Sequence, residues 1–200
     1  MRSVVRWWCF PRLERIVSRR YAISVLALWS PVDVTLGIIG PLGAAAAAGT
    51  ALVIDLDVHG PPFGGAFSLA DLVADGPTRA QLEPSKQGPA VLRNGGVDAE
   101  QAAEVVAALI ERWPNVVLRC PPSTGASSQA IALLPLLPEP FTPKVEGRVV
   151  YQDTRLPRPR SPLGPVLPVP RAGTVRALLA GSRPSPGDRW VRAFRQVWEM

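Results

Sequence analysis

The chain has 200 residues, a length that suits one domain with extensions. Its net charge is +6, but residues 1–20 hold six Arg and one Glu, residues 148–200 hold ten Arg and three acids, and the middle holds twelve acids and six basic residues. Two cysteines and one histidine argue against a disulfide framework and a structural zinc site, and they fit a reducing cytoplasm.

The Arg-rich ends have two explanations. Basic segments bind nucleic acid or an anionic membrane through counterion release and surface potential. They are also ordinary in compositions that are rich in Arg and poor in Lys, and this chain has only two Lys. Contact with nucleic acid or anionic lipid is therefore one expectation, beside a purely compositional origin.

Membrane insertion is a minor expectation. The apolar run near the start is broken by Pro11, so residues 1–20 form a basic extension and not a signal peptide. Residues 35–54 are uncharged over the length of a spanning helix, but they are rich in Gly and Ala, contain Pro41, and are flanked by aspartates. A helix and a strand are the favoured reading of that stretch.

Strands and helices are predicted to alternate along residues 21–153. A continuous aliphatic run predicts a strand over 21–30, buried on both faces. The helix over 98–113 has the clearest amphipathic period, with Asp98 expected as its N-cap. Helix and strand patterns predict the remaining elements, namely helices over 35–49, 68–76 (capped by Ser68) and 127–137, and strands over 50–57, 88–96, 115–122 and 147–153.

The last fifty residues have a different pattern. Residues 154–171 hold six prolines and are expected to form an extended connection. Residues 172–200 follow as a C-terminal helical segment with two short helices.

Strands separated by helices of this length predict a doubly wound α/β fold with a mostly parallel sheet and helices on both faces. Ligands in this class bind beyond the carboxyl ends of the strands. Asp55, Asp57 and Arg119 all stand at such ends, so we expect them at one edge of the sheet.

The order of several motifs resembles the ParA/MinD-like P-loop ATPases, including the CpaE-like branch. The matching features are a buried strand followed by Ser-Pro at 30–31, "LVIDLD" at 52–57, "SLADLV" at 68–73 and "NVVLRCPP" at 115–122. The resemblance covers about residues 21–153. It implies a P-loop NTPase-like fold of the SIMIBI type, and ATP with Mg²⁺ as the cofactors of intact members.

The first departure from the family is the phosphate loop. Between the first strand and the following helix, the family has K-G-G-x-G-K-[ST], whereas this chain has only Val32, Asp33 and Val34. Phosphate binding needs glycines whose N–H groups converge and a Lys that reaches the β- and γ-phosphates. Asp33 would repel a phosphate, and Thr35 alone matches the hydroxyl that would hold Mg²⁺.

The second departure is Arg119, which stands where the family has its Walker B aspartate. A guanidinium cannot bind a cation, so Asp55 and Arg119 are predicted to form an ion pair in the place of Mg²⁺. The nucleotide-site remnant would then be Thr35, Asp55, Asp57 and Arg119. In the plainer alternative, Asp57 caps a turn and Asp55 meets water.

Three other features have mainly structural explanations. The glycines at 37, 40 and 43 suit helix packing better than a shifted phosphate loop. The single histidine, His59, lacks a triad partner at a motif spacing, so no catalytic residue is predicted. Cys120 is expected to be buried, with an exposed thiol as the alternative.

In the terminal segment, Trp190, Phe194 and Trp198 share one helical face, while Arg192 and Arg195 occupy the other. One explanation is that the aromatic face packs on the α/β domain. The other is contact with a membrane or partner, since this amphipathic pattern suits anionic headgroups, and the resemblance to MinD-like proteins implies a basic amphipathic helix here.

The function expected from these features is that of a catalytically impaired ParA/MinD-like protein. It would use no cofactor and would act by binding an unknown protein partner, such as an intact homologue, or a surface. It would be cytoplasmic, and peripheral to the membrane if the terminal helix binds lipid. The alternatives are a weak or unorthodox ATP-binding ATPase, with ATP and Mg²⁺, and an unrelated α/β binding protein or small enzyme.

Overall fold

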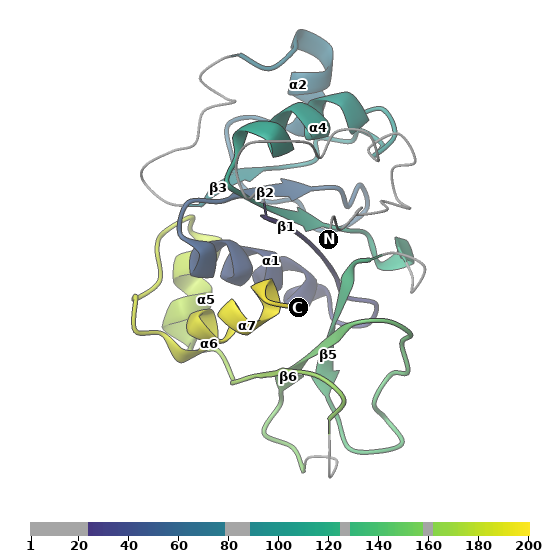
Figure 1. Cartoon of the computed structure of the whole chain (residues 1–200), viewed down its shortest axis with the longest axis vertical. Helices are drawn as coiled ribbons and strands as arrows, with labels where there is room; N and C mark the ends of the chain where they lie inside the picture. Colours follow the sequence, from purple (N-terminus) through teal and green to yellow (C-terminus); the bar gives the residue numbers. More distant parts are fainter. Residues whose placement is uncertain (1–23, 79–88, 125–128, 158–161) are drawn as a thin grey trace, which may run out of the picture.

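Seven parallel strands form one sheet in the order β3-β2-β4-β1-β5-β6-β7 (Figure 1). The computed structural model describes residues 24–78, 89–124, 129–157 and 162–200. The basic extension at 1–20 lies outside the described residues. The strands are β1 (Ser24–Trp29), β2 (Leu52–Asp55), β3 (Ala90–Leu92), β4 (Asn115–Arg119), β5 (Ile131–Leu136), β6 (Val149–Asp153) and β7 (Val166–Leu167).

Helices cover both faces of this sheet, which confirms the doubly wound α/β class. The apolar side chains of the strands alternate between two cores, so that Leu52 and Ile54 face one core while Val53 faces the other. Helices α2 (Leu69–Asp75) and α4 (Ala103–Arg112) pack in the first core, and the second contains α1 (Val34–Ala48), α5 (Ala172–Leu179), α6 (Arg189–Ala193) and α7 (Arg195–Trp198) (Figure 1).

The strand order brings the predicted site elements together. β4 lies between β1 and β2, and it pairs with both in parallel register. The chain runs from β1 toward β2 and β3 at one edge, and it later crosses from β4 to β5, β6 and β7 at the other. The carboxyl ends of β1, β2 and β4 therefore meet where the winding direction changes, which is where ligands bind in open α/β sheets.

Helix α1 forms as predicted, although it contains Pro41 and three glycines. The glycines allow close packing on both sides of the helix. A Cβ on Gly40 would come within 2.2 Å of Leu133 Cδ1, and one on Gly43 within 2.4 Å of Trp190 Cζ3. The packing explanation therefore holds for Gly40 and Gly43, but not for Gly37, whose Cβ would make only an ordinary contact of 3.6 Å with Ser30 Cβ.

The two helices on the other face differ in how they begin. Ser68 and Asp71 form a capping box at the start of α2, and the helix ends at Gly76, as the sequence predicted. Asp98 is not the N-cap of α4. The backbone carbonyl of Asp98 accepts a hydrogen bond from Ala102 N–H, so turns occupy the preceding residues and the helix itself begins at Ala103 without a side-chain cap.

The helix predicted over 127–137 is wrong, because Ile131–Leu136 forms strand β5. Short apolar runs do not distinguish a buried strand from a buried helix by period alone. Here pairing decides: β5 lies between β1 and β6, and its residues are mostly fully buried. The proline at 135 lies beyond the two β5 residues that pair with β1.

The C-terminal segment belongs to the second core. Within the predicted extended connection, Val166 and Leu167 form β7 and pair with β6. The terminal helix is divided into α6 and α7, which pack on α1 together with α5. None of the helices in the described ranges is long and apolar enough to cross a membrane, and residues 35–54 are divided between α1 and β2.

Candidate functional site

The candidate site is built by two register partners at the carboxyl edge. Asp55 is the last residue of β2, Arg119 is the last residue of β4, and the two are paired across the parallel ladder. Residues two positions earlier, Val53 and Val117, face the core that contains α1. Because side chains alternate along a strand, Asp55 and Arg119 point to that same face.

Arg119 forms ion pairs with both aspartates. Its Nη1 lies 3.2 Å from Asp55 Oδ2, and its Nη2 lies 3.0 Å from Asp57 Oδ2. Asp55, Asp57 and Arg119 are only 0, 5 and 3% exposed. The predicted approach of Asp55 and Arg119 is confirmed, and Asp57 completes a buried triad that we call the Asp-Arg-Asp triad.

The guanidinium is also fixed by the loop that follows β2. Nη1 donates a hydrogen bond of 2.8 Å to the carbonyl of Pro61, and the guanidinium carbon lies 5.0 Å from the centre of the Phe63 ring. Arg119 therefore ties the 57–63 loop to the sheet, through charge, a hydrogen bond and a cation–π contact.

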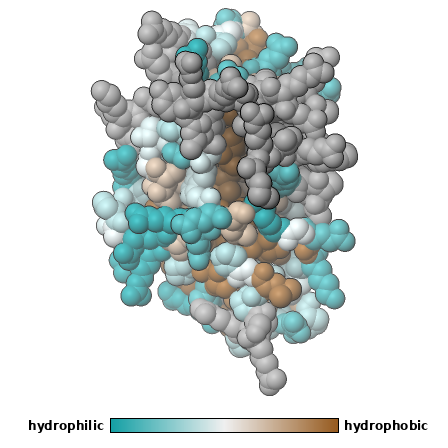
Figure 2. Space-filling model, in the orientation of Figure 1, coloured by the Kyte–Doolittle hydropathy of each residue, from teal (hydrophilic) through white to brown (hydrophobic). Residues whose placement is uncertain are grey.

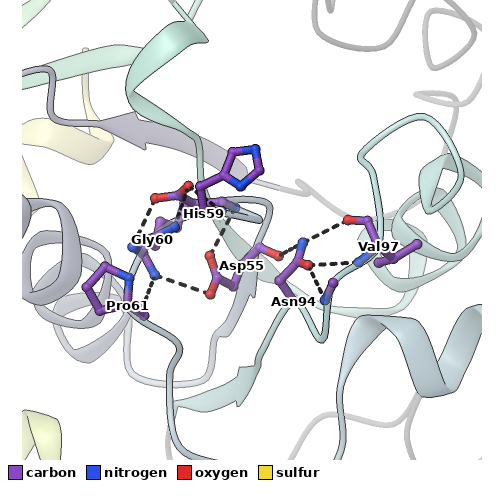
Figure 3. A network of polar contacts seen from close by, with 9 residues as sticks. Asp55, His59, Gly60, Pro61, Asn94 and Val97 are labelled. Carbon is purple, nitrogen blue, oxygen red and sulfur yellow. Dashed lines mark hydrogen bonds and ion pairs between the residues drawn. The ribbon is translucent and has the colours of Figure 1, made fainter.

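Asp57 has a second role as a turn residue. Its Oδ1 accepts hydrogen bonds from the backbone N–H groups of His59, at 3.3 Å, and Gly60, at 3.0 Å (Figure 3). Asp57 therefore both caps the turn and forms an ion pair with Arg119, so its explanation as a turn residue and its place beside Arg119 are compatible. The expectation that Asp55 meets water is wrong, because the β4 strand and the loop cover it.

Gly60 is required by this close packing. A Cβ on Gly60 would lie 2.1 Å from Arg119 Nη2 and 2.1 Å from Asp57 Oδ2. Any larger side chain would therefore displace the ion pair.

Asn94 is a site residue that the sequence analysis did not identify. Its Nδ2 donates to the carbonyls of Asp55, at 3.2 Å, and Val97, at 3.0 Å. Its Oδ1 accepts from the N–H groups of Gly96 and Val97 (Figure 3). The available signal was Asn-Gly-Gly directly after a strand, since an asparagine in such a turn bonds neighbouring backbone groups. Asn94 holds the end of β2 in place.

The environment of Asp55 changes its acidity. Burial raises its pKa, while the Arg119 guanidinium and hydrogen bonds from the backbone of Asp57 and from Asn94 lower it, and the charge of Asp57 raises it further. The net result raises the pKa of Asp55 to about 6. The carboxylate is therefore largely ionised at neutral pH and becomes protonated under mildly acidic conditions.

A second carboxylate occupies the start of α1. Asp33 is the N-cap residue, and its Oδ1 accepts a hydrogen bond of 2.9 Å from the N–H of Leu36. Ser30 Oγ accepts from the N–H of Asp33 and donates to the carbonyl of Leu133, so the connection between β1 and α1 is fixed on the sheet. An internal anion thus stands at the helix N-terminus, where anions such as phosphate are otherwise bound.

A pocket of about 250 Å³ opens between these two sets of residues. Its acidic and basic lining residues are Asp33, Asp57, His59 and Arg119, so the two carboxylates are opposed by the guanidinium of Arg119. The remaining lining residues are Ser30, Pro31, Val32, Val34, Gly37, Gly60, Pro61, Cys120 and Pro122.

The side chains of Thr35 and His59 take no part in the hydrogen-bonded network beside this pocket, although His59 lines it. Thr35 is exposed in the first turn of α1 and does not line it. The imidazole of His59 points away from the hydrogen-bonded network (Figure 3). Cys120 is buried, as expected. In the described ranges, no group of three or more His, Cys, Asp or Glu side chains could hold a metal ion.

The aromatic residues of the terminal segment do not join the site. Trp190 and Phe194 are buried against α1, with their rings 4.9 Å apart in an edge-on arrangement. Trp198 is half-buried and donates to the carbonyl of Ala44. Of the residues expected to contact a membrane or partner, only Arg192 and Arg195 are exposed. The structure therefore has the arrangement in which the aromatic face packs on the α/β domain.

A scan against models of known protein families found no match to this chain, and a search of curated proteins found none.

Proposed function

We propose that this chain is a catalytically impaired protein of the ParA/MinD-like kind, which binds a protein partner at the carboxyl edge of its sheet instead of hydrolysing ATP. The observation that carries the proposal is the Arg119 guanidinium between two buried carboxylates. A cation supplied by the chain itself fills the position where a nucleotide-bound Mg²⁺ would be needed.

The chemistry of phosphoryl transfer supports this reading. Such sites need a loop that cradles the phosphates, a cation to stabilise their charge, and an acid that orients Mg²⁺, all at one place. β1 and β4 are neighbours whose ends could present the loop and the acid together. Here those ends carry Asp33 and Arg119, which have the wrong charge for phosphate and for metal, respectively.

The same edge has features of a protein contact. Val32 and Val34, on the rim of the pocket, are 56 and 61% exposed. Neighbouring apolar side chains that remain exposed beside a pocket are typical of interaction sites. An intact homologue with a working nucleotide site is the partner that the resemblance suggests.

The first prediction is that ATP with Mg²⁺ neither stabilises the protein nor is hydrolysed by it. A ligand present at about 100 times its Kd would stabilise the native state by roughly 2.7 kcal/mol. Millimolar ATP with Mg²⁺ should therefore change the Tm no more than tripolyphosphate does. The tripolyphosphate control detects general binding of polyanions to the basic ends of the chain. A rise in Tm specific to ATP with Mg²⁺, or phosphate release that Asp55→Asn abolishes, would contradict the proposal and favour an unorthodox ATPase.

The second prediction concerns the partner surface. We expect a Val32→Ser/Val34→Ser variant to lose at least tenfold in affinity for an intact ParA/MinD-like ATPase of the same organism, measured by isothermal titration calorimetry, because two apolar contacts would be removed. Val73→Ser is the control, since Val73 is also partly exposed but lies on α2. Equal affinity of the double variant and the wild type would rule out this edge as the contact.

A further inference from the structure

The pocket at the carboxyl edge has more negative than positive charge around it. Asp33 lines it from the start of α1, and Asp57 lines it from the loop after β2. The guanidinium of Arg119 also lines it, but it is already paired with Asp57 and with Asp55. Three carboxylates therefore share one guanidinium, which leaves two negative charges in excess. The proposed protein contact on the rim does not use this excess.

Asp33 is the carboxylate without a cation. Among the residues that the structure describes, it takes part in no ion pair. Its Oδ1 accepts a hydrogen bond from the N–H of Leu36, and its side chain is half-buried at the pocket. The start of α1 compensates this charge only in part, since a helix N-terminus is equivalent to roughly half a positive charge.

Both pocket carboxylates can accept further hydrogen bonds. An ionised carboxylate has about four lone-pair sites. Asp57 uses three of them, for the N–H groups of His59 and Gly60 and for Arg119 Nη2. Asp33 uses one, for Leu36. Each carboxylate can therefore accept at least one N–H group from a ligand in the pocket.

The same contacts argue against an anion or a metal ion as the ligand. Arg119 Nη1 donates to Asp55 and to the carbonyl of Pro61, and Nη2 donates to Asp57. A phosphate or carboxylate would therefore meet an occupied guanidinium and the charge of Asp33. No metal-binding group of three or more His, Cys, Asp or Glu side chains exists within the described ranges. An organic cation is the remaining class of charged ligand.

The walls of the pocket suit an aliphatic chain. Pro31, Val32 and Val34 line it from the segment where α1 begins, and Pro61 and Pro122 line it from the loops after β2 and β4. By contrast, Figure 2 shows mainly hydrophilic side chains over the region that α5, α6 and α7 occupy in Figure 1. The pocket volume of about 250 Å³ lies below the roughly 300–1,000 Å³ of sites for drug-sized ligands, so its ligand is small.

We propose that this pocket binds a short aliphatic diamine, that is, a few CH₂ groups with an ammonium group at each end. One ammonium group donates to Asp33 and the other to Asp57, through charge-assisted hydrogen bonds. The proline and valine side chains contact the CH₂ groups between them. Two ammonium groups also balance the two carboxylates in excess. The diamine binds to this chain alone, so the inference does not depend on the proposed protein partner.

The test is isothermal titration calorimetry of the full chain at pH 7.5 in phosphate buffer, which contains no competing amine. The probes are 1,3-diaminopropane, 1,4-diaminobutane and 1,5-diaminopentane. The comparison ligands are n-butylamine, which has one positive charge, 1,4-butanediol, which has none, and succinate, which has two negative charges. The three diamines together measure the spacing that the two carboxylates accept.

The variant is Asp33→Asn, because asparagine is as good an N-cap as aspartate and keeps the start of α1 while it removes the charge. The control is Asp75→Asn, which makes the same charge change at an exposed residue of α2 outside the pocket. Equal Tm values of the two variants without ligand would show that folding is unaffected.

We expect at least one diamine to bind with a Kd of about 1 mM or lower, and n-butylamine to bind about tenfold or more weakly, because it makes one charge-assisted hydrogen bond fewer. The diol and succinate should give no binding heat. Asp33→Asn should weaken diamine binding by about tenfold or more, for the same reason, while Asp75→Asn should change it by less than about twofold.

Four results would overturn the proposal: no heat from any diamine at millimolar concentration, binding of succinate in preference to the diamines, equal affinity for the best diamine and n-butylamine, and equal losses in the two variants. If Asp33→Asn lowers the Tm, the comparison of diamine, monoamine and diol on the wild type still decides. None of these measurements contains ATP or a partner protein, so failure here and failure of the proposed function can be distinguished.

Discussion

The Asp-Arg-Asp triad places two carboxylates and one guanidinium in a site that water hardly reaches. A buried ion pair adds little net stability compared with apolar residues of similar volume, but removal of one partner leaves a charge that nothing compensates, at a cost of about 3–5 kcal/mol. Loss of Arg119 is expected to destabilise the fold more than loss of either aspartate, because it would leave the Asp55 and Asp57 carboxylates without their shared cation. The triad therefore constrains substitutions at all three positions.

The third prediction is that Asp55→Asn removes a pH-dependent part of the stability. The pKa of Asp55 is about 6 in the folded protein and 3.8 in the unfolded reference, so the folded state binds the proton more tightly. Its stabilising contribution is complete below pH 3.8 and is lost as the pH rises to about 6, which amounts to roughly 3 kcal/mol. Urea unfolding of the wild type and the variant between pH 4 and 7 measures this difference. A difference in unfolding free energy that is the same at every pH would contradict the raised pKa.

The fourth prediction concerns Gly60. We expect Gly60→Ala to destabilise the protein by about 1–3 kcal/mol, since the new methyl group would overlap Arg119 and Asp57. Gly64→Ala is the control from the same loop, because a Cβ there meets nothing within 4 Å. Thermal or chemical unfolding of the two variants checks the prediction, and equal stabilities would show that the triad can move aside.

At the scale of elements, α1 has two different kinds of glycine. Gly40 and Gly43 allow close contact with β5 and α6, respectively, whereas Gly37 has only an ordinary contact of 3.6 Å with Ser30 Cβ. Glycine inside a helix costs roughly 0.5–1 kcal/mol relative to alanine. The helix tolerates that cost at Gly40 and Gly43 because it is packed between the sheet and the terminal helices.

The fifth prediction follows from this difference. We expect Gly43→Ala to destabilise the protein by about 1–3 kcal/mol, because its Cβ would enter the Trp190 and Phe194 rings. Gly37→Ala in the same helix should stabilise the protein by up to about 1 kcal/mol. Urea unfolding separates the two, and tryptophan fluorescence reports the displaced ring. Stabilisation by both substitutions would show that the terminal helices are loosely packed.

At the scale of the whole molecule, the C-terminal helices are bonded to both the sheet and α1. Trp190 Nε1 donates to Gln152 Oε1 at 2.7 Å, which links α6 to the edge of the sheet near β6 and β7. Trp198 donates to the backbone of α1. The residues after the proline-rich connection therefore complete the core over α1 and do not form an independent appendage.

The sixth prediction is that deletion of residues 188–200 unfolds the protein. The deletion removes four fully or nearly buried apolar side chains, each worth about 1.5–3 kcal/mol, from a fold whose total stability is expected to be about 5–15 kcal/mol. Deletion of residues 199–200 alone, which are exposed, should leave the Tm within a few degrees. Circular dichroism melting curves compare the two truncations. A cooperative transition in the longer deletion would show that α1 and α5 suffice for this face.

Local patterns were enough to predict the fold class, most elements and the position of Asp55 and Arg119 at the carboxyl edge, and the resemblance added the prediction that the two form an ion pair. Strand ends, caps and amphipathic periods depend on neighbours in sequence, and parallel strands bring their carboxyl ends to one edge. Other features depended on residues far apart in the chain. β5 is a strand because β1 and β6 pair with it, and Asn94 joins the site because β3 lies beside β2. The sequence pattern of the aromatic face in the terminal segment suits contact with lipid and contact with protein equally. The face packs on protein because the fold places the apolar surface of α1 against it.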